Sequence, residues 1–385
     1  MEKIENRVIH CPFVSDSDNL VKNLERTFLK GTLKTRTLVN KGVIAILFNR
    51  APSASHRFYE QLLPRLHSKS PPFILAQEHV KRLDARYAGE LRVDRTIEQL
   101  PNETLYLKDV QLEVNGENFQ LDGILFTKTS MLLLEMKNMI GTLHIEPNTH
   151  QFTRTLATGQ TEGMKNPLDQ LARNATCIRQ LLKNYHLHIP VHELLIFSNT
   201  QSLLTKSFHT DGIVHLYGLP AKWETFLDRN KTQFWDAKLP PIEQSGKNFA
   251  SEILPSEKEL NLVEIEELLK KYQTPAKRFI PYNYAEIKPH IRKGVLCKCG
   301  ATLHFKNSLW RCQRCGYKGK NDHLGALEAY RVLFSDEITT KEWMEFSGMT
   351  DVSTAKRMLS RVPYLEVISR NRYQRYKIRD VRENS

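Results

Sequence analysis

Three charged side chains lie within the most apolar stretch of the sequence, residues 119–138. Asp122 belongs to the first of two strand-like segments in this stretch, and Glu135 and Lys137 belong to the second. Side chains two apart in a strand share a face, so Glu135 and Lys137 are expected to point the same way. Burying a lone carboxylate costs several kcal/mol unless it is paired or binds a metal. The pattern therefore predicts a site where two carboxylates and an amine meet.

Such a site is suited to a divalent cation and to phosphate chemistry. If the hairpin turns at 127–131, Asp122 lies near Met136 and converges with Glu135. Mg²⁺ prefers oxygen ligands and keeps bound waters, and a neighbouring lysine can orient or deprotonate water and offset charge on a phosphate. We therefore expect Asp122 and Glu135 to bind Mg²⁺ or Mn²⁺, with Lys137 assisting phosphodiester hydrolysis. A surface salt bridge between Glu135 and Lys137 is the simpler alternative.

Helices are expected before this hairpin and strands around it. Residues 1–100 have apolar side chains three and four apart, as in helices, including segments 19–31 and 55–66. We expect the helical pattern at 73–100 to break near Gly89 and to end at Pro101. Beyond these residues the period changes to two, which indicates strands. Strands are expected at 104–114, 119–127, 131–138, 141–146, 150–157, 193–199 and 213–219.

A second helix is expected at 166–185, after the hairpins. Asn166 is a good N-cap and Pro167 a good first helical residue. The apolar residues that follow at helical spacing give this segment one apolar stripe. The resulting order of helices, strands, helix and strands predicts an α/β fold.

Several short motifs in this region resemble the NERD family, the nuclease-related domain, over roughly residues 80–225. They occur in the family's order, each with the family's spacing. The matching motifs are Gly89-Glu90, Gln120-x-Asp122, Glu135-x-Lys137-Asn138 followed by Gly141, and Asn166-Pro167-x-x-Gln170. The family in turn resembles a branch of the PD-(D/E)xK nucleases, which implies a restriction-endonuclease-like mixed sheet flanked by helices.

The resemblance also implies roles for individual side chains. Asp122 and Glu135 would be metal ligands, Glu90 would hold a second metal or a metal-bound water, and Gln170 would contact the phosphate or water. An exposed helix charge is the alternative for Glu90, and a solvated or capping amide is the alternative for Gln170. Leu121 stands where the superfamily's name has proline, a departure that NERD sequences commonly share.

Four of the six cysteines lie close together near residue 300, at Cys297, Cys299, Cys312 and Cys315. Two close pairs separated by a hairpin are typical of a zinc ribbon. We expect a structural Zn²⁺, because four thiolates would fill its coordination sites. His304 or His323 can replace one of the first two cysteines, and disulfide bonds are a further alternative.

Residues 336–378 have the order of elements of a winged helix. Thr339 or Thr340 can cap a first short helix, and Asp351 or Ser353 can cap a second, before two strands that form a wing. In this geometry the second helix enters the major groove of DNA and the wing contacts the backbone. The residues expected to bind nucleic acid are Lys356, Arg357, Arg370, Arg372 and Arg375. A protein-interaction module is the alternative.

The basic charge is concentrated at the C-terminal end. The chain has a net charge of +13, and residues 276–385 contain 22 Lys and Arg against 11 Asp and Glu, or +11. Such a surface favours a polyanionic partner. We expect no membrane-spanning segment and no secretion signal, and hence a cytoplasmic protein. Whether it forms a homo-oligomer or joins partner proteins in a larger assembly stays open.

The sequence thus predicts five regions. They are an N-terminal helical region (1–80), a NERD nuclease-like domain (81–236), a linker with a short helix (237–290), a zinc ribbon (291–320) and a winged-helix-like nucleic-acid-binding domain (321–385). We expect a Mg²⁺-dependent endonuclease, a hydrolase of phosphodiester bonds, acting on DNA rather than RNA. The alternative is a non-catalytic nucleic-acid-binding, regulatory or scaffold protein that retains a nuclease fold.

Overall fold

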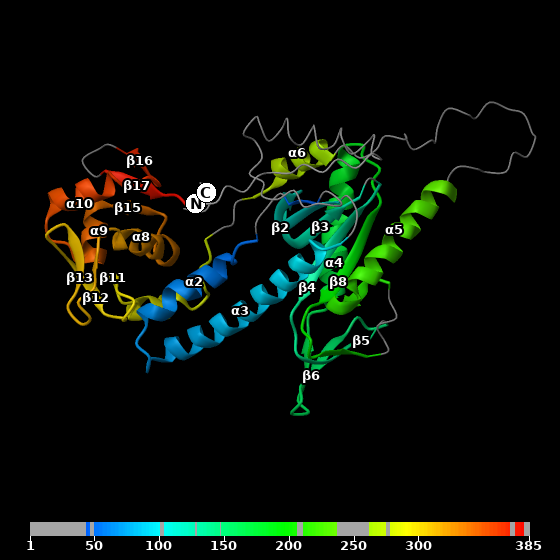
Figure 1. Cartoon of the computed structure of the whole chain (residues 1–385), viewed down its shortest axis with the longest axis horizontal. Coiled ribbons are helices and arrows are strands. Elements are labelled where there is room, and N and C mark those ends of the chain that lie inside the picture. Colours follow the sequence, from blue (N-terminus) through cyan, green and yellow to red (C-terminus); the bar gives the residue numbers. More distant parts are fainter. Residues whose placement is uncertain are drawn as a thin grey trace, which may run out of the picture. The chain divides into compact units, whose positions relative to one another are not determined.

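The computed structural model of the protein divides the chain into two compact units (Figure 1). The first unit is Met1–Ala51 with Gly89–Pro275, and the second is Pro52–Ala88 with Ala276–Ser385. The structure describes residues 44–46, 50–100, 104–127, 129–146, 148–205, 211–236, 262–274, 278–369 and 374–380. The helix expected at 19–31, the segment 237–261, and Arg370 and Arg372 lie outside the described residues.

A six-stranded mixed sheet forms the centre of the first unit. Its order is β1-β2-β3-β4-β8-β10. The strands are β1 (Ile44–Ile46), β2 (Thr104–Val114), β3 (Glu117–Phe126), β4 (Met131–Lys137), β8 (Val191–Phe197) and β10 (Ile213–His215). The β2–β3 and β3–β4 pairs are antiparallel, whereas β1–β2, β4–β8 and β8–β10 are parallel. Strand β1 lies in a region that the sequence predicted to be helical.

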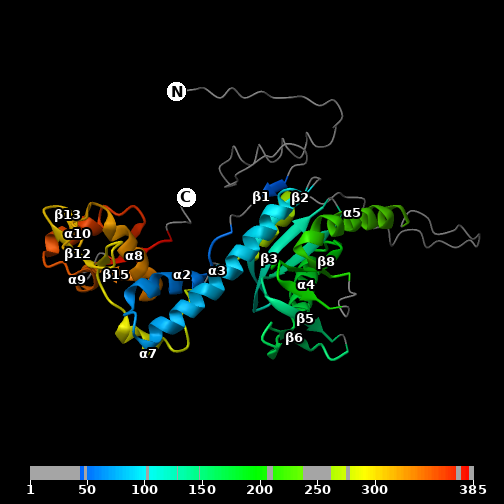
Figure 2. The same cartoon turned by 60° about the horizontal axis from the view of Figure 1, so that its bottom comes forward.

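Helices cover both faces of this sheet (Figure 2). Helices α4 (Pro167–Asn184) and α6 (Leu262–Tyr272) share one apolar core with β2, β3 and β4. Helices α3 (Pro71–Ile97) and α5 (Leu219–Asp236), with the short 3₁₀ turn η2 (Leu216–Gly218), contribute to the core on the opposite face. The predicted mixed α/β sheet flanked by helices is therefore confirmed, and it has the layers of a nuclease-like fold.

Helix α4 begins and packs as its sequence predicts. The Asn166 side chain accepts a hydrogen bond from the Leu168 backbone N–H at 3.0 Å, and Pro167 occupies the first helical position. The stripe that includes Leu171 and Ile178 is fully buried against the sheet. This packing fixes which helical face is turned toward β4.

Helix α3 continues through Gly89, where the sequence predicted a break, so that prediction is wrong. A Cβ at Gly89 would lie 2.5 Å from Asn138 Cβ and 2.6 Å from Ser198 Oγ. The glycine therefore allows the helix to approach the residues that follow β4 and β8. Glycine is needed at this position because it has no side chain to obstruct the packing, and not because the chain turns there.

A smaller four-stranded sheet extends the first unit, in the order β7-β6-β5-β9. Its strands are β5 (Gly141–Ile145), β6 (Phe152–Thr155), β7 (Thr161–Met164) and β9 (Ser202–Leu204). The predicted β5–β6 hairpin is confirmed, with Leu143 paired to Arg154, but β7 and β9 were not predicted. The strand expected at 213–219 ends at His215, because the chain turns there into η2 and α5.

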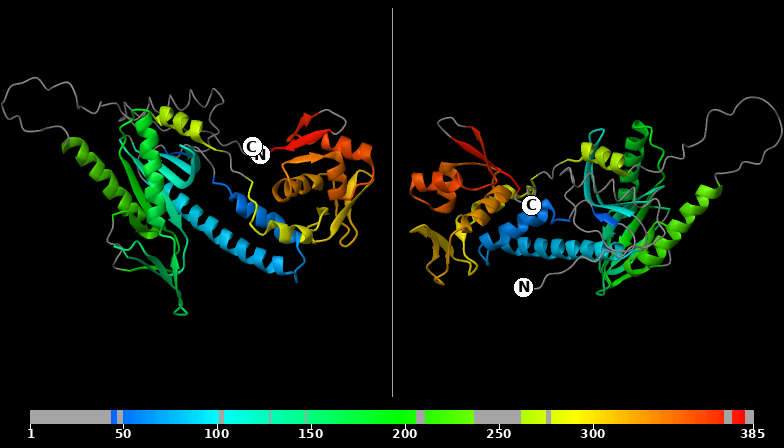
Figure 3. Two further views of the ribbon diagram at one scale, coloured as in Figure 1. Left: turned by 180° about the vertical axis from the view of Figure 1, so that it is seen from behind. Right: turned by 45° about the horizontal axis from the view of Figure 1, so that its top comes forward.

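The second unit contains two small sheets and short helices (Figure 3). The first sheet is β11 (Val295–Leu296), β12 (Thr302–Lys306), β13 (Leu309–Cys312) and β14 (Lys318–Gly319), in that order. The second sheet has the order β15-β17-β16, with β15 (Glu337–Thr339), β16 (Leu365–Ser369) and β17 (Arg375–Ile378). Its α-helices are α2 (Ala54–Leu62), α7 (Tyr284–Ile287), α8 (Asp322–Leu333), α9 (Thr340–Ser347) and α10 (Val352–Leu359), with 3₁₀ turns η1 (Leu63–Arg65) and η3 (Lys288–His290).

The two small sheets share one apolar core. Trp310, from the first sheet, belongs to the same buried cluster as Trp343 of α9, Leu359 of α10 and Tyr376 of β17. Trp310 is fully buried, so it packs and does not stack on a ligand. The four-cysteine region and the winged-helix-like region are therefore one folded body.

The helix ends in this body follow the predicted signals. Thr339 caps α9 through a capping box with Glu342, and Gly348 ends the helix with a φ of 75°. Asp351 caps α10 by accepting a hydrogen bond from the Thr354 N–H at 2.6 Å. These caps satisfy backbone groups that short helices otherwise leave unpaired.

Helix α2 belongs to the second unit. Phe58 and Leu62 of this helix are buried in a cluster with Ile287 and Leu333. The helix predicted at 55–66 thus exists, as α2 and η1, and it packs against residues more than 200 positions away in the sequence. Among the described helices, none combines the length and apolarity needed to cross a membrane.

Candidate functional site

Strands β3 and β4 place Asp122 across from Glu135. The ladder pairs Phe126 with Met131 and Gly123 with Leu134, so its continuation sets Asp122 opposite Glu135. The prediction that Asp122 lies near Met136 is confirmed, but the assumed turn, with 127 opposite 131, is wrong by one residue. The reason is that the Thr127 N–H donates to the Ser130 carbonyl at 2.9 Å, which closes the turn one residue earlier.

Asp122 lies where the regular alternation of β3 breaks. Ile124 and Leu121, three positions apart, pack into the same core, so the strand changes faces between them. On β2 the facing residue is Asp109, which has a φ of 52° and is missing from the β2–β3 ladder. The Asp122 side chain, 3% exposed, instead accepts a hydrogen bond from the Met136 N–H at 2.7 Å. Its carboxylate thereby reaches the residue next to Glu135.

Glu135 contacts both of the other polar residues predicted on this side of the sheet. Lys137 Nζ lies 2.5 Å from Glu135 Oε1, and Gln170 Nε2 of α4 donates to Glu135 Oε2 at 3.3 Å. Glu135 is 2% exposed, whereas the Lys137 side chain is 30% exposed. The pair is therefore not a simple surface salt bridge. A buried carboxylate here meets an amine that solvent and substrate can reach.

Glu90 of α3 is also buried, but an arginine that the sequence did not single out holds it. Arg50 Nη1 lies 3.4 Å from Glu90 Oε2, and the same guanidinium binds both Asp94 carboxylate oxygens at 2.9 and 3.0 Å. Arg50 Nη2 also donates to the Asp122 backbone carbonyl at 2.7 Å. Arg50 thus links the helix carboxylates to the strand that carries Asp122.

This cluster keeps its charges fixed. Burial disfavours the charged form of Arg50, but the hydrogen bond to Asp94 and the nearby acidic groups outweigh it and raise the pKa of the guanidinium. Burial, and next the charge of Asp94, raise the pKa of Tyr106 well above its ordinary value. Tyr106 therefore stays neutral and donates its hydroxyl to Asp94 at 2.6 Å. The result is a rigid, charge-balanced support behind Asp122.

Carboxylate oxygens are the ligands that Mg²⁺ prefers, and Asp122 and Glu135 supply them from adjacent strands. Glu90, Asp122 and Glu135 do not form a set of three ligands within 4.8 Å of one another in the described part of the chain. Glu90 is instead held by Arg50.

The four predicted cysteines do come together, with all four Sγ atoms within 4.8 Å of one another. The Cys297–Cys315 and Cys299–Cys312 sulfur separations are 3.6 and 3.5 Å. A disulfide needs about 2 Å, whereas sulfurs about 2.3 Å from a shared tetrahedral zinc lie nearly 4 Å apart. Neither His304 nor His323 belongs to the group.

Local backbone geometry supports this arrangement. Gly300 and Gly316, which follow the two cysteine pairs, have φ angles of 85° and 74°, where glycine is favoured. A hydrogen bond from the Cys315 N–H, with a further one from Arg314, lowers the pKa of Cys312 to about 6. A thiolate is the form that binds metals.

The residues predicted to bind nucleic acid are only partly within the described region. Lys356 and Arg357 are exposed on α10. Arg375 is exposed on β17 and forms an ion pair with Glu337 at 3.3 Å, which reduces its charge available to a ligand. The β15-β17-β16 sheet with α9 and α10 has the order of elements expected for a winged helix.

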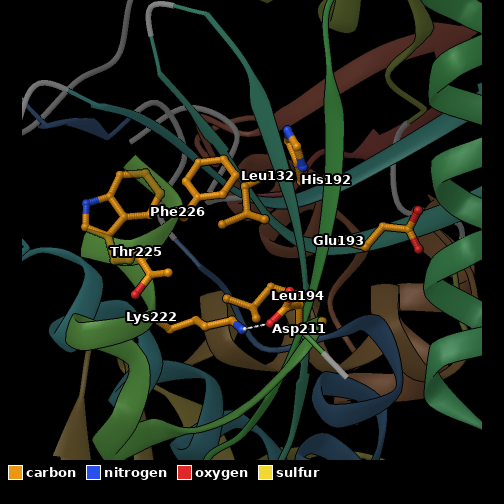
Figure 4. A pocket seen from close by; sticks show the side chains of 10 residues that line it. Leu132, His192, Glu193, Leu194, Asp211, Lys222, Thr225 and Phe226 are labelled. Atoms are coloured by element: carbon orange, nitrogen blue, oxygen red, sulfur yellow. Dashed lines mark hydrogen bonds and ion pairs between the residues drawn. The ribbon is translucent and has the colours of Figure 1, made fainter. Parts of the chain in front are cut away.

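A separate pocket of about 320 Å³ lies at the other end of β4 and β8 (Figure 4). Its lining includes Leu132, His192 and Phe226, and Lys222 pairs with Asp211 at 3.4 Å at its edge. None of the predicted catalytic residues lines it. The candidate site is therefore defined by its converging charges and not by this hollow.

A mixed sheet covered on both faces, with buried acidic residues on two neighbouring strands, defines a nuclease-like α/β domain. Comparison with protein families agrees, since residues 85–198 match the NERD family, described as the nuclease-related domain. No curated protein and no solved structure matches the chain. The match includes every residue predicted to act in catalysis, from Glu90 to Gln170.

Proposed function

We propose that the protein is a metal-dependent endonuclease that hydrolyses phosphodiester bonds of DNA. The observation that supports this most is a set of contacts along β4. Asp122 of β3 accepts a hydrogen bond from the Met136 N–H, and Glu135 beside it contacts Lys137 and Gln170 of α4. The match to a nuclease-related family supports the same reaction class. Buried carboxylates beside a partly exposed amine serve no obvious purpose in a purely structural strand pair.

Each side chain has a distinct proposed task. Asp122 and Glu135 would hold Mg²⁺ or Mn²⁺, which when bound makes water more acidic and offsets phosphate charge. Lys137 presents its ammonium to a phosphate oxygen or to the attacking water, since its side chain is the exposed member of the pair. Gln170 orients a water or phosphate oxygen by its amide. Arg50 keeps Asp122 in place through its backbone carbonyl.

The second unit would deliver the nucleic acid. Cys297, Cys299, Cys312 and Cys315 would bind a structural Zn²⁺ that holds the ribbon on its shared core. The proposed contacts of the winged-helix-like region are Lys356, Arg357, Arg370, Arg372 and Arg375. We favour DNA over RNA because a helix followed by a basic wing suits the major groove of B-form DNA.

The test is cleavage of plasmid and linear DNA with Mg²⁺ or Mn²⁺. Asp122→Asn and Lys137→Ala should each lower the cleavage rate by roughly a hundredfold or more, as loss of a charge-stabilising group does in other enzymes. Glu113→Gln on β2 and Lys183→Ala on α4, both at exposed positions, are matched controls and should retain the wild-type rate. Equal rates in wild type and Asp122→Asn would exclude the proposed reaction. Binding without metal-dependent cleavage would favour a non-catalytic nucleic-acid-binding or scaffold protein.

A further inference from the structure

A groove of about 710 Å³ lies within the second unit, between the four-cysteine region and α10. One wall is the β12–β13 hairpin with its turn at Asn307 and Ser308, together with the residues that lead into α8. The other wall is the N-terminal part of α10 with the turn before it. Because residues from both walls pack in one apolar core, this packing fixes the width of the groove.

Exposed cations stand on both walls of the groove. Lys306 and Lys320 lie on the ribbon side, and Arg357 and Arg361 lie on the α10 side. No ion pair joins any of these four side chains to a carboxylate in the described residues. Arg357 donates to Thr354 Oγ1 at 3.5 Å, and its charge is one of the causes that lower the pKa of Asp351. Their charges are therefore available to a ligand.

The carboxylate that lines the groove, that of Asp351, already caps helix α10. Asp351 accepts the Thr354 N–H that begins α10, and hydrogen bonds from Thr354 lower the pKa of its carboxyl below the ordinary value. It remains ionised as the helix cap. The groove thus presents four cations against one carboxylate, which is the charge balance of an anion-binding surface.

The lining of the groove also includes the apolar side chains of Phe305, Met349 and Met358, which we call its floor. Phe305 is half-buried there and packs against Trp310, with ring centroids 5.1 Å apart. Met349 and Met358 add polarisable side chains beside it. An anion such as free phosphate would not use this floor, whereas a nucleotide chain has both phosphates for the walls and bases for the floor.

We propose that this groove binds a single strand of nucleic acid, with phosphates held by Lys306, Lys320, Arg357 and Arg361 and bases turned toward Phe305. This proposal rests on the proposed action of the protein on nucleic acid, and it gives Arg357 a contact with a single strand in place of the major-groove contact of a winged helix described above. A positively charged groove with an aromatic surface is how proteins bind single strands without sequence preference. A duplex keeps its bases stacked inside and has none to offer the floor.

The test measures binding of the full-length, zinc-loaded chain by fluorescence anisotropy. All variants carry Asp122→Asn so that cleavage cannot interfere, and the probes are labelled oligothymidylate and a blunt duplex of equal length. The groove variants are the pairs Lys306→Glu with Lys320→Glu, and Arg357→Glu with Arg361→Glu. The control pair, Lys318→Glu with Lys341→Glu, makes the same charge change at exposed positions outside the groove.

Each groove pair should weaken oligothymidylate binding by about tenfold or more. It should also reduce the salt dependence of log K by roughly 0.7 for every phosphate that the variant no longer neutralises. The control pair should change affinity by no more than about threefold, as a general electrostatic effect. Zinc content and circular dichroism establish that each variant is folded.

Two outcomes would overturn the proposal. One is an equal loss of oligothymidylate affinity in the control pair, which would show that the loss depends only on the net charge of the protein. The other is a loss of duplex binding with oligothymidylate binding unchanged, which would assign the surface to double-stranded nucleic acid. Neither outcome depends on cleavage, so failure of the nuclease assay and failure of the groove are distinguishable.

Discussion

The candidate sites of the two units hold their cations in opposite ways. In the first unit, three cations each contact a buried or half-buried carboxylate: Arg50 with Asp94, Lys108 with Glu98 at 2.6 Å, and Lys137 with Glu135. In the second unit, cations project from the surface around the groove, at Lys306, Lys320, Arg357 and Arg361. The first arrangement fixes charges at set positions, whereas the second leaves charge for a partner.

The two arrangements suit different tasks, a reaction centre in the first unit and the binding of a polyanion in the second. Charges buried among apolar side chains interact strongly and are little screened by salt, which suits a reaction centre. Exposed cations gain affinity for a polyanion by releasing its counterions, and that gain falls steeply as salt rises. Under the proposed function, the second unit would determine how tightly nucleic acid is held, and the first unit would determine whether it is cleaved.

The largest expected effect is loss of the metal from the second unit. Cys312→Ser should abolish zinc binding and unfold this unit, because structural zinc contributes roughly 10 kcal/mol or more, beyond what a small domain can lose. Zinc content and limited proteolysis check this prediction. The first unit should stay folded, as seen from protection of fragments that contain β4 and α4. A Cys312→Ser chain that still binds one zinc and resists proteolysis would contradict the assignment.

A matched pair of arginine substitutions tests the contrast directly. Arg50→Met should lower the free energy of unfolding by about 3–5 kcal/mol, because it leaves Glu90 and Asp94 buried without their cation. Arg357→Met should change it by less than about 0.5 kcal/mol, since that side chain is exposed, yet it should weaken binding to nucleic acid. Urea unfolding curves and anisotropy titrations measure the two quantities. Similar stability losses in both variants would show that the two units do not differ in this way.

A smaller effect distinguishes two helical glycines. Gly89→Ala should destabilise the first unit by roughly 1–3 kcal/mol, because the added methyl group meets Asn138 and Ser198. Gly325→Ala, in α8, meets nothing within 4 Å and should stabilise the second unit by about 0.5–1 kcal/mol through a better helix propensity. Thermal unfolding followed by circular dichroism is sufficient. Equal responses would mean that α3 has room to shift at Gly89.

Local patterns in the sequence predicted the parts of the fold whose causes are local. Two apolar runs separated by a short turn located β3 and β4, and Asn166 with Pro167 located the start of α4. The spacing of Glu135 and Lys137 was enough to place both side chains together. The Thr339 and Asp351 caps were likewise readable, because a cap acts on backbone groups two or three residues away.

The missed features depend on contacts between distant residues. Arg50 precedes the Asp122 strand by 72 positions, and nothing around it in the sequence marks it as a partner of Asp94. Gly89 has the appearance of a helix breaker, and only the approach of Asn138 explains why a helix requires it. The register of β3 and β4 depends on how Thr127 and Ser130 close the turn. Pairing across such distances is set by tertiary packing.

The hydrogen bond between the Asp122 carboxylate and the Met136 amide affects which residues a related protein would retain after losing activity. Asp122 helps to hold two strands together in addition to its proposed role as a metal ligand, so a related protein that had lost the proposed activity would still gain stability from it. Lys137 has no comparable duty among the described contacts beyond Glu135. Among related chains, a lysine at the position of Lys137 should therefore indicate an active enzyme better than an aspartate at the position of Asp122, because the aspartate can be retained for stability alone.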